Sequence, residues 1–147
     1  MSNLNNVVPD IYKNLISLSD GVSLPLSEKD IDVTVEGIRE ALLSWARPEE
    51  RNKDFTVRMS NVGKPARQLW FEKRDKDSKR DIDAPTQLKF LYGHLLEEIV
   101  LMLVRMAGHT VTDEQKEVDI KGIKGHMDCK INGEVVDVKT ASRFAFN

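Results

Sequence analysis

Apolar side chains recur every three or four residues in two long segments of the chain, which is the spacing of an amphipathic helix. In the first segment, residues 32–48, the spacing is kept up to Pro48, which closes the pattern. Its apolar stripe consists of Val35, Ile38, Leu42 and Trp45. The pattern predicts a helix in this segment.

The second segment, residues 84–111, is apolar on nearly every side from Leu88 to Met106. A helix can start near Pro85 and Thr86, because proline lacks only an N–H that has no partner in the first turn. Gly108 is a natural C-terminal stop. A helix that is apolar all round is expected to be central and buried.

Weaker patterns precede these helices. Residues 1–30 predict a short helix and a loop, broken by Gly21 and Pro25. The stretch "SNVGKPARQLWFEK" predicts another helix, with Pro65 in its first turn and Trp70 and Phe71 in the core. Residues 73–81 have no apolar periodicity and predict a solvated loop, with contact to a DNA backbone as the alternative.

Strand patterns follow the second segment. Three candidate strands run over residues 109–120, 123–131 and 134–141. Helices first and strands afterwards predict an α+β fold with an antiparallel three-stranded meander. The length of 147 residues suits a single domain. We expect a helical part over residues 1–80 and a functional core over residues 85–142.

Asn132-Gly133 lies between two strand patterns and predicts a two-residue type I′ hairpin turn. That turn would place Cys129 opposite Val136 and Asp128 opposite Asp137. One face of the hairpin would then be apolar, with Met127, Cys129, Ile131, Val136 and Val138. The other face would carry His126, Asp128, Lys130, Asp137 and Lys139, with His126 opposite Lys139.

Two carboxylates at directly opposed positions of a hairpin cost stability unless something offsets their charge. Mg²⁺ prefers carboxylate oxygens and keeps several waters, so Asp128 and Asp137 are enough to begin a metal site. Lys139 would lie beside it on the same face. The ordinary alternative is a solvated face of an antiparallel sheet.

The composition of the chain indicates a compartment and limits the kinds of partner, but it does not indicate a function. The net charge of −2 gives no general sign of a nucleic-acid partner, so any such binding needs a local patch. The single cysteine, Cys129, leaves no internal disulfide and fits a reducing, cytoplasmic compartment. No apolar run is long enough to span a membrane, and no membrane partner is expected.

The hairpin residues "GHMD…DVK" resemble the signature of the PD-(D/E)XK nucleases, with Asp128 as the first acid and Asp137-Val138-Lys139 as the (D/E)-x-K. "YGHLLEE" is similar to the G-x-x-x-E helix of the RecB-like and phage exonuclease branch. "SNVGKPARQLW" resembles the S-x-x-G-x-C-P-x-R helix start of RecB-like relatives. Gln115 stands where lambda-exonuclease-like members often have glutamine.

The resemblance implies a restriction-endonuclease-like core and a Mg²⁺- or Mn²⁺-dependent DNA exonuclease, in the cytoplasm of a bacterial or phage-infected cell. It implies that one or two ions are held by Glu97, Asp128, Asp137 and the Val138 carbonyl, with Lys139 as a catalytic residue. Apart from the resemblance, Arg67 near a helix N-terminus could contact phosphate. His126, opposite Lys139, could touch the scissile phosphate, with a structural histidine as the alternative. Ser142, shortly after Lys139, is the third candidate DNA contact. Supporting positions beside the ligands fall to His94, Glu98 and Gln115. Glu97 is favoured over Glu98 as the ligand, and that choice stays open.

Two departures from the family pattern matter. Lys64 stands where the iron–sulfur relatives have cysteine, so no iron–sulfur cluster is expected. The chain stops eight residues after Lys139, before the helix with a Q-x-x-x-Y motif with which the family usually continues. We therefore expect a fragment, a minimal member, or a core completed by a homo-oligomer or protein partner. The alternative function is a non-catalytic nucleic-acid-binding or assembly module that keeps the nuclease fold.

Overall fold

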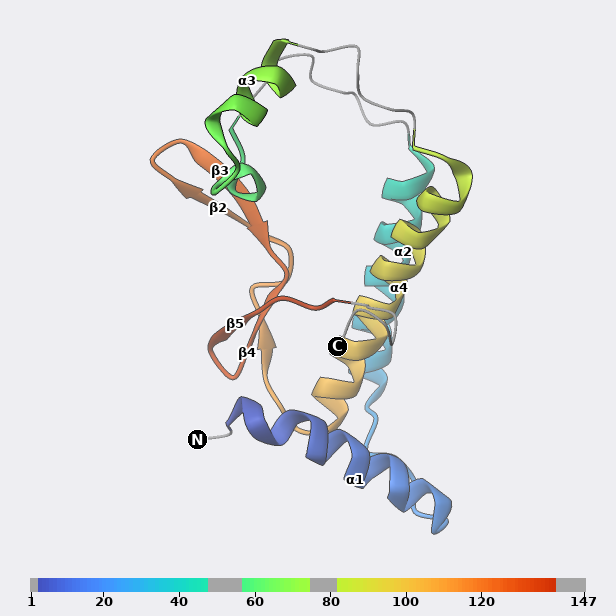
Figure 1. Cartoon of the computed structure of the whole chain (residues 1–147). Coiled ribbons are helices and arrows are strands. Elements are labelled where there is room, and N and C mark those ends of the chain that lie inside the picture. Colours follow the sequence, from blue (N-terminus) through green and yellow to red (C-terminus); the bar gives the residue numbers. More distant parts are fainter. Residues whose placement is uncertain (1–2, 48–56, 75–81, 140–147) are drawn as a thin grey trace.

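A computed structural model describes residues 3–47, 57–74 and 82–139. The helices in these ranges are α1 (Val7–Ser19), α2 (Glu28–Ala46), α3 (Ala66–Arg74) and α4 (Ala84–Met106), with 3₁₀ turns η1 (Leu4–Asn6) and η2 (Met59–Asn61). The strands are β1 (Val111–Thr112), β2 (Lys116–Ile120), β3 (Ile123–Met127), β4 (Cys129–Ile131) and β5 (Glu134–Val136). The predicted α+β class is confirmed (Figure 1).

The ends of α2 and α4 follow from local capping. Ser27 accepts a hydrogen bond from the Asp30 N–H at the start of α2, and Asp83 accepts one from the Thr86 N–H at the start of α4. Gly108 has a φ of 84° directly after α4, and the His109 N–H donates to the Val104 carbonyl. The predicted stop at Gly108 is therefore confirmed, because glycine adopts this left-handed conformation without steric cost.

The prediction that α4 is buried on all sides is wrong. Only its C-terminal part is buried, through Leu101, Val104 and Met106. Large apolar side chains farther toward its N-terminus are exposed: Leu88, Phe90, Tyr92, Leu96, Ile99 and Val100. Within the described ranges, no helix is both long and apolar enough to cross a membrane.

Helices α2 and α4 lie side by side along most of their lengths (Figure 1). Thr34 is buried, and at Gly37 an added Cβ would meet the Glu98 carboxylate of α4 at 2.2 Å. Of the apolar stripe that predicted this helix, Val35, Leu42 and Trp45 are exposed and Ile38 is half-buried. The helix prediction is thus confirmed, while most of the predicted apolar stripe is exposed.

The strands form one bent antiparallel meander, split into a sheet β1-β4-β5 and a sheet β2-β3. Thr112 pairs with Lys130, and Lys116 pairs with Met127. Between these two pairs, the three residues 113–115 therefore lie opposite the two residues 128 and 129. This one-residue excess is a β-bulge, and the Gln115 N–H donates to the Asp128 carbonyl across it at 2.8 Å. The first two predicted strands are therefore each broken at the bulge.

The core lies where α1, α4 and β4 meet. It consists of Val7, Leu101, Val104, Cys129 and Ile131. Cys129 is fully buried, and burial raises the pKa of its thiol to about 11. As the sequence predicts, Cys129 behaves as a small core side chain.

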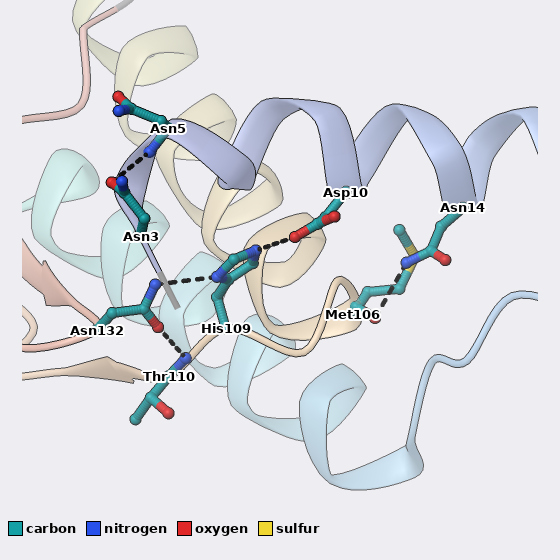
Figure 2. Close-up of polar contacts among 8 residues, drawn as sticks. All are labelled: Asn3, Asn5, Asp10, Asn14, Met106, His109, Thr110 and Asn132. Carbon is teal, nitrogen blue, oxygen red and sulfur yellow. Dashed lines mark hydrogen bonds and ion pairs between the residues drawn. The ribbon is translucent and has the colours of Figure 1, made fainter. Parts of the chain in front are cut away.

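A polar relay around the buried side chain of His109 fastens α1 to the meander (Figure 2). His109 Nε2 lies 3.1 Å from Asp10 Oδ2, and His109 Nδ1 lies 2.9 Å from the Asn132 side-chain nitrogen. Asn132 Oδ1 accepts from the Thr110 N–H at 3.1 Å. Asn14 also donates to the Met106 carbonyl at 3.4 Å. The hairpin turn, the end of α4 and α1 are thereby joined by side chains.

The segment of η2 and α3, residues 57–74, contacts β3 at Gly125 (Figure 1). An added Cβ at Gly125 would meet the Met59 side chain at 2.8 Å, so glycine is needed for this close approach. Arg58 also forms an isolated parallel bridge with Lys124. The predicted helix after Pro65 is confirmed as α3, but Trp70 and Phe71 are exposed rather than in the core.

Candidate active site

The predicted hairpin turn positions the candidate site. Asn132 and Gly133 have φ values of 55° and 89°, as a type I′ turn requires. The register from Ile131–Glu134 to Cys129–Val136 is the predicted one. The turn therefore brings Asp128 and Asp137 to the same end of the β4–β5 pair.

Asp128 does not continue the strand ladder. Instead of lying as a free carboxylate opposite Asp137, it accepts a hydrogen bond at Oδ2 from the Val138 N–H at 2.8 Å. The side chain of Asp128 thus fastens the backbone of the predicted D-x-K segment. This bond uses one of the two carboxylate oxygens.

Lys139 lies on Asp137. The two form an ion pair of 2.5 Å between Lys139 Nζ and Asp137 Oδ2, and both side chains are largely exposed. The hydrogen bond and charge of Asp137, with a smaller effect of Asp128, raise the pKa of Lys139. The ammonium therefore stays charged beside both aspartates.

Glu97 approaches the hairpin from α4. Its pKa is raised, first by burial and then by the charge of Asp128, with a smaller effect of Asp137. Gln115 donates to Glu97 Oε1 at 2.7 Å and partly counteracts this rise. Because the Gln115 backbone also bonds Asp128 across the bulge, one residue links the helix acid to the hairpin acid.

Glu98 points elsewhere. It faces Gly37 of α2, and burial together with the charges of Glu114 and Glu97 raises its pKa. No effect of Asp128 or Asp137 is among the causes of that shift, whereas both act on Glu97. Glu97 is therefore the acid that faces the hairpin.

The remaining predicted site residues are spread more widely. His94 is exposed one turn before Glu97 and lowers the pKa of that acid. The predicted pairing of His126 with Lys139 is wrong, because the ladder with β5 ends at Val136 and His126 lies opposite Glu117 on β2. Arg67 is exposed in the first turn of α3. The ribbon of α3 lies away from β4–β5 (Figure 1). Ser142 lies outside the described residues.

A cleft of about 730 Å³ between α2 and α4 reaches this site. Glu97, Glu98, His94 and Gln115 line it, together with the aromatic side chains of Trp45 and Phe90. The pattern of apolar stripes did not predict these two aromatic residues as part of the cleft. Trp45 and Phe90 lie far apart in the sequence, and they line the same cleft only because α2 packs on α4.

The donor chemistry of these residues fits a hard divalent cation. Carboxylate oxygens are the ligands that Mg²⁺ prefers. The pKa of Glu97 is raised first by burial and then by the charge of Asp128, and a bound cation would offset both effects. Among the described residues, however, no three His, Cys, Asp or Glu side chains lie close enough together to hold an ion. The carboxylates are within electrostatic range of one another without forming a closed ligand set.

Known protein families, characterised proteins and solved structures were each searched, and none matches this chain. The chemistry of the site is therefore inferred from its own residues.

Proposed function

We propose that this chain is a metal-dependent deoxyribonuclease of the PD-(D/E)XK type, acting as a phage-type exonuclease. One observation carries the proposal. Glu97 from α4 lies within the electrostatic range of Asp128 and Asp137, and the Lys139 ammonium lies on Asp137. The order of Glu97, Asp128, Asp137 and Lys139 along the chain is that of the nuclease signature, and the charges of both aspartates act on Glu97.

Each residue has a distinct task in this proposal. Glu97, Asp128, Asp137 and the Val138 carbonyl would hold the cation, and Gln115 would fix one oxygen of Glu97. When bound, Mg²⁺ or Mn²⁺ lowers the pKa of a water molecule and polarises the scissile phosphate. The Lys139 ammonium would exchange Asp137 for the phosphate or the attacking water, and so stabilise the charge that develops there.

The test is a nuclease assay on linear and circular DNA with Mg²⁺, Mn²⁺ or chelator. We expect degradation of linear DNA only when metal is present. Lys139→Ala should lower the turnover rate by roughly two orders of magnitude, the scale of one lost electrostatic or acid–base contact. Lys124→Ala is the matched control, because Lys124 is also an exposed lysine paired with a carboxylate, Glu117, at 2.8 Å. Its turnover rate should equal that of the parent.

Cleavage at the parent rate by Lys139→Ala would remove the catalytic role of the D-x-K segment. The second candidate function is a non-catalytic nucleic-acid-binding module with the same fold. It is favoured by the exposed rings of Trp70 and Phe71 on α3, against which Arg74 and Arg67 lie. DNA binding without metal-dependent degradation in the same assay would select this second function.

A further inference from the structure

Positive charge is concentrated in residues 57–74, called here the basic segment. It contains five basic residues, Arg58, Lys64, Arg67, Lys73 and Arg74, and one acidic residue, Glu72. The whole chain, by contrast, has a net charge of −2. The basic segment is thus the kind of local patch that an acidic chain needs in order to attract a polyanion.

On one face of helix α3 in the basic segment, two aromatic rings are flanked by two arginines. Arg67, Trp70, Phe71 and Arg74 are spaced by three, four and seven residues, which places them on one side of a helix. Trp70 and Phe71 are 50% and 49% exposed. Large aromatic side chains at this exposure, framed by arginines, form an open binding surface.

The side chains of this face are ordered by one another. The Arg74 guanidinium lies 4.6 Å from the centre of the Trp70 ring, and that of Arg67 lies 5.8 Å from the Phe71 ring. The Trp70 and Phe71 rings meet edge to face at 4.9 Å. Such contacts hold arginines and rings in position before a ligand arrives, which lowers the entropy lost on binding.

The one acid of the basic segment does not cancel the charge of this face. Glu72 accepts hydrogen bonds from Lys64 at 3.1 Å and from Gln68 at 2.9 Å. Glu72 is thus engaged by Lys64 and Gln68, while Arg67 and Arg74 lie against the rings. The positive charge of the face is therefore available to an anionic ligand.

We propose that the Arg67–Trp70–Phe71–Arg74 face of α3 binds single-stranded DNA, with bases stacked on the rings and phosphates on the arginines. A ligand for this face needs exposed flat apolar groups and regularly spaced negative charge. Unpaired nucleotides have both, whereas paired bases in a duplex are hidden in the stack. That single-stranded DNA is also the substrate of the enzyme rests on the proposed nuclease function. Binding itself needs neither metal nor cleavage.

The test measures anisotropy of a labelled oligothymidylate, about 12 nucleotides long, with the full chain in chelator. The parent should bind it more tightly than a duplex of the same length. Trp70→Leu keeps an apolar side chain but removes the stacking surface, and should weaken binding about ten-fold or more. Tyr12→Leu on α1 is the matched control, since Tyr12 is an exposed aromatic residue outside the basic segment. It should bind as the parent does.

The charge part is tested separately with Arg67→Gln combined with Arg74→Gln. The slope of log affinity against log salt should become shallower by roughly 1.4, since each phosphate contact with a single strand contributes about 0.7. Arg39→Gln removes an exposed arginine of α2 and should leave the slope unchanged. All these side chains are exposed, so the variants should unfold at the parent temperature.

Parent-like affinity and slope in the Trp70 and arginine variants would overturn the proposal, as would a parent that does not bind the oligonucleotide. Loss of self-association in sedimentation, with DNA binding intact, would instead assign the face to a second copy of the chain. The nuclease proposal fails separately: α3-dependent binding without degradation of DNA in Mn²⁺ rejects the enzyme and keeps this surface. If the α3 variants degrade DNA with the kinetics of the parent, the enzyme is kept and the α3 surface is rejected as the binding site for its substrate.

Discussion

At the residue scale, the carboxyl of Glu97 carries an electrostatic penalty with a measurable consequence. Burial and the charges of Asp128 and Asp137 raise its pKa above the ordinary value. A carboxyl whose pKa is raised in the folded state favours folding while protonated, and that contribution is lost as the pH rises through the raised pKa. In chelator, the ionised Glu97 therefore destabilises the fold.

We predict that Glu97→Gln stabilises the metal-free protein at neutral pH. The amide keeps the size of the side chain and an oxygen that can accept from Gln115, while the charge beside Asp128 is removed. The effect should be small, about 1–2 °C in the unfolding temperature, because the side chain is only half-buried. It should vanish near pH ~4, where Glu97 is increasingly protonated.

Thermal unfolding in chelator at several pH values measures this difference. Glu36→Gln is the control, because Glu36 is an exposed acid of α2 that pairs with Arg39. Its substitution should not raise the unfolding temperature. A Glu97→Gln protein less stable than the parent across the whole pH range would contradict the electrostatic description of the site.

The residues of the D-x-K segment show what could be predicted at this scale. Asp137 and Lys139 are two residues apart on one extended segment, so alternation alone puts them on the same side, and they do form an ion pair. The partner of His126 was predicted by extending the same register past Asp128. That extension fails because Asp128 bonds the Val138 N–H and the bulge shifts the strand by one residue.

At the scale of elements, the bulge explains why the meander was only partly predictable. Asn132-Gly133 alone predicts the β4–β5 turn, because a type I′ turn needs a positive φ at both central residues and this pair adopts it readily. The bulge has no comparable signal: Asp113 and Gln115 adopt φ values of 55° and 49° without being glycine. Asp113 is held by Lys116 and Lys130, at 3.0 and 2.7 Å. Lys116 is a local partner, three residues away, but Lys130 belongs to another strand, and its pairing with Asp113 is not apparent from the order of residues.

The relay around His109 gives a prediction for how α1 is attached. We expect His109→Ala to lower the free energy of unfolding by about 2–4 kcal/mol, because it removes a buried ring and leaves Asp10 and Asn132 without this partner. Urea unfolding measures the loss. Amide hydrogen exchange should rise chiefly in residues 7–19, since α1 is the element that the relay holds (Figure 2).

Lys13→Ala on the exposed side of α1 is the matched control and should change neither measurement by more than about 0.5 kcal/mol. If exchange in α1 is unchanged in His109→Ala, the helix is held by Val7 and its apolar neighbours rather than by the relay.

At the scale of the whole molecule, the order of elements was predictable and the extent of burial was not. Helices followed by strands indicated an α+β fold, which the structure has. The apolar surface of α4 indicated burial on all sides, yet Phe90, Tyr92 and Leu96 are exposed. Apolar periodicity identifies which residues can be buried. The elements available to cover them decide which ones are, and α2 covers only one side of α4.

The last prediction concerns the response of the whole fold to metal. If Glu97, Asp128 and Asp137 hold a cation, the ion binds the folded chain and not the unfolded one, so millimolar Mn²⁺ should raise the unfolding temperature. At a concentration 100 times Kd the gain is roughly 2.7 kcal/mol, or about 5–10 °C for a chain of this size. Asp128→Asn should abolish the shift. The asparagine oxygen can still accept from the Val138 N–H, so the hairpin should remain folded.

Asp113→Asn is the control for this response. Asp113 lies on the same bulge, but its carboxylate is already paired with Lys116 and Lys130, whose hydrogen bonds lower its pKa. Its variant should therefore keep the full Mn²⁺ shift. An unfolding temperature of the parent that does not move with Mn²⁺, or a full shift in Asp128→Asn, would mean that the ion does not bind these carboxylates. In that case Glu97 and the two aspartates would be a destabilising cluster with no cation to offset it.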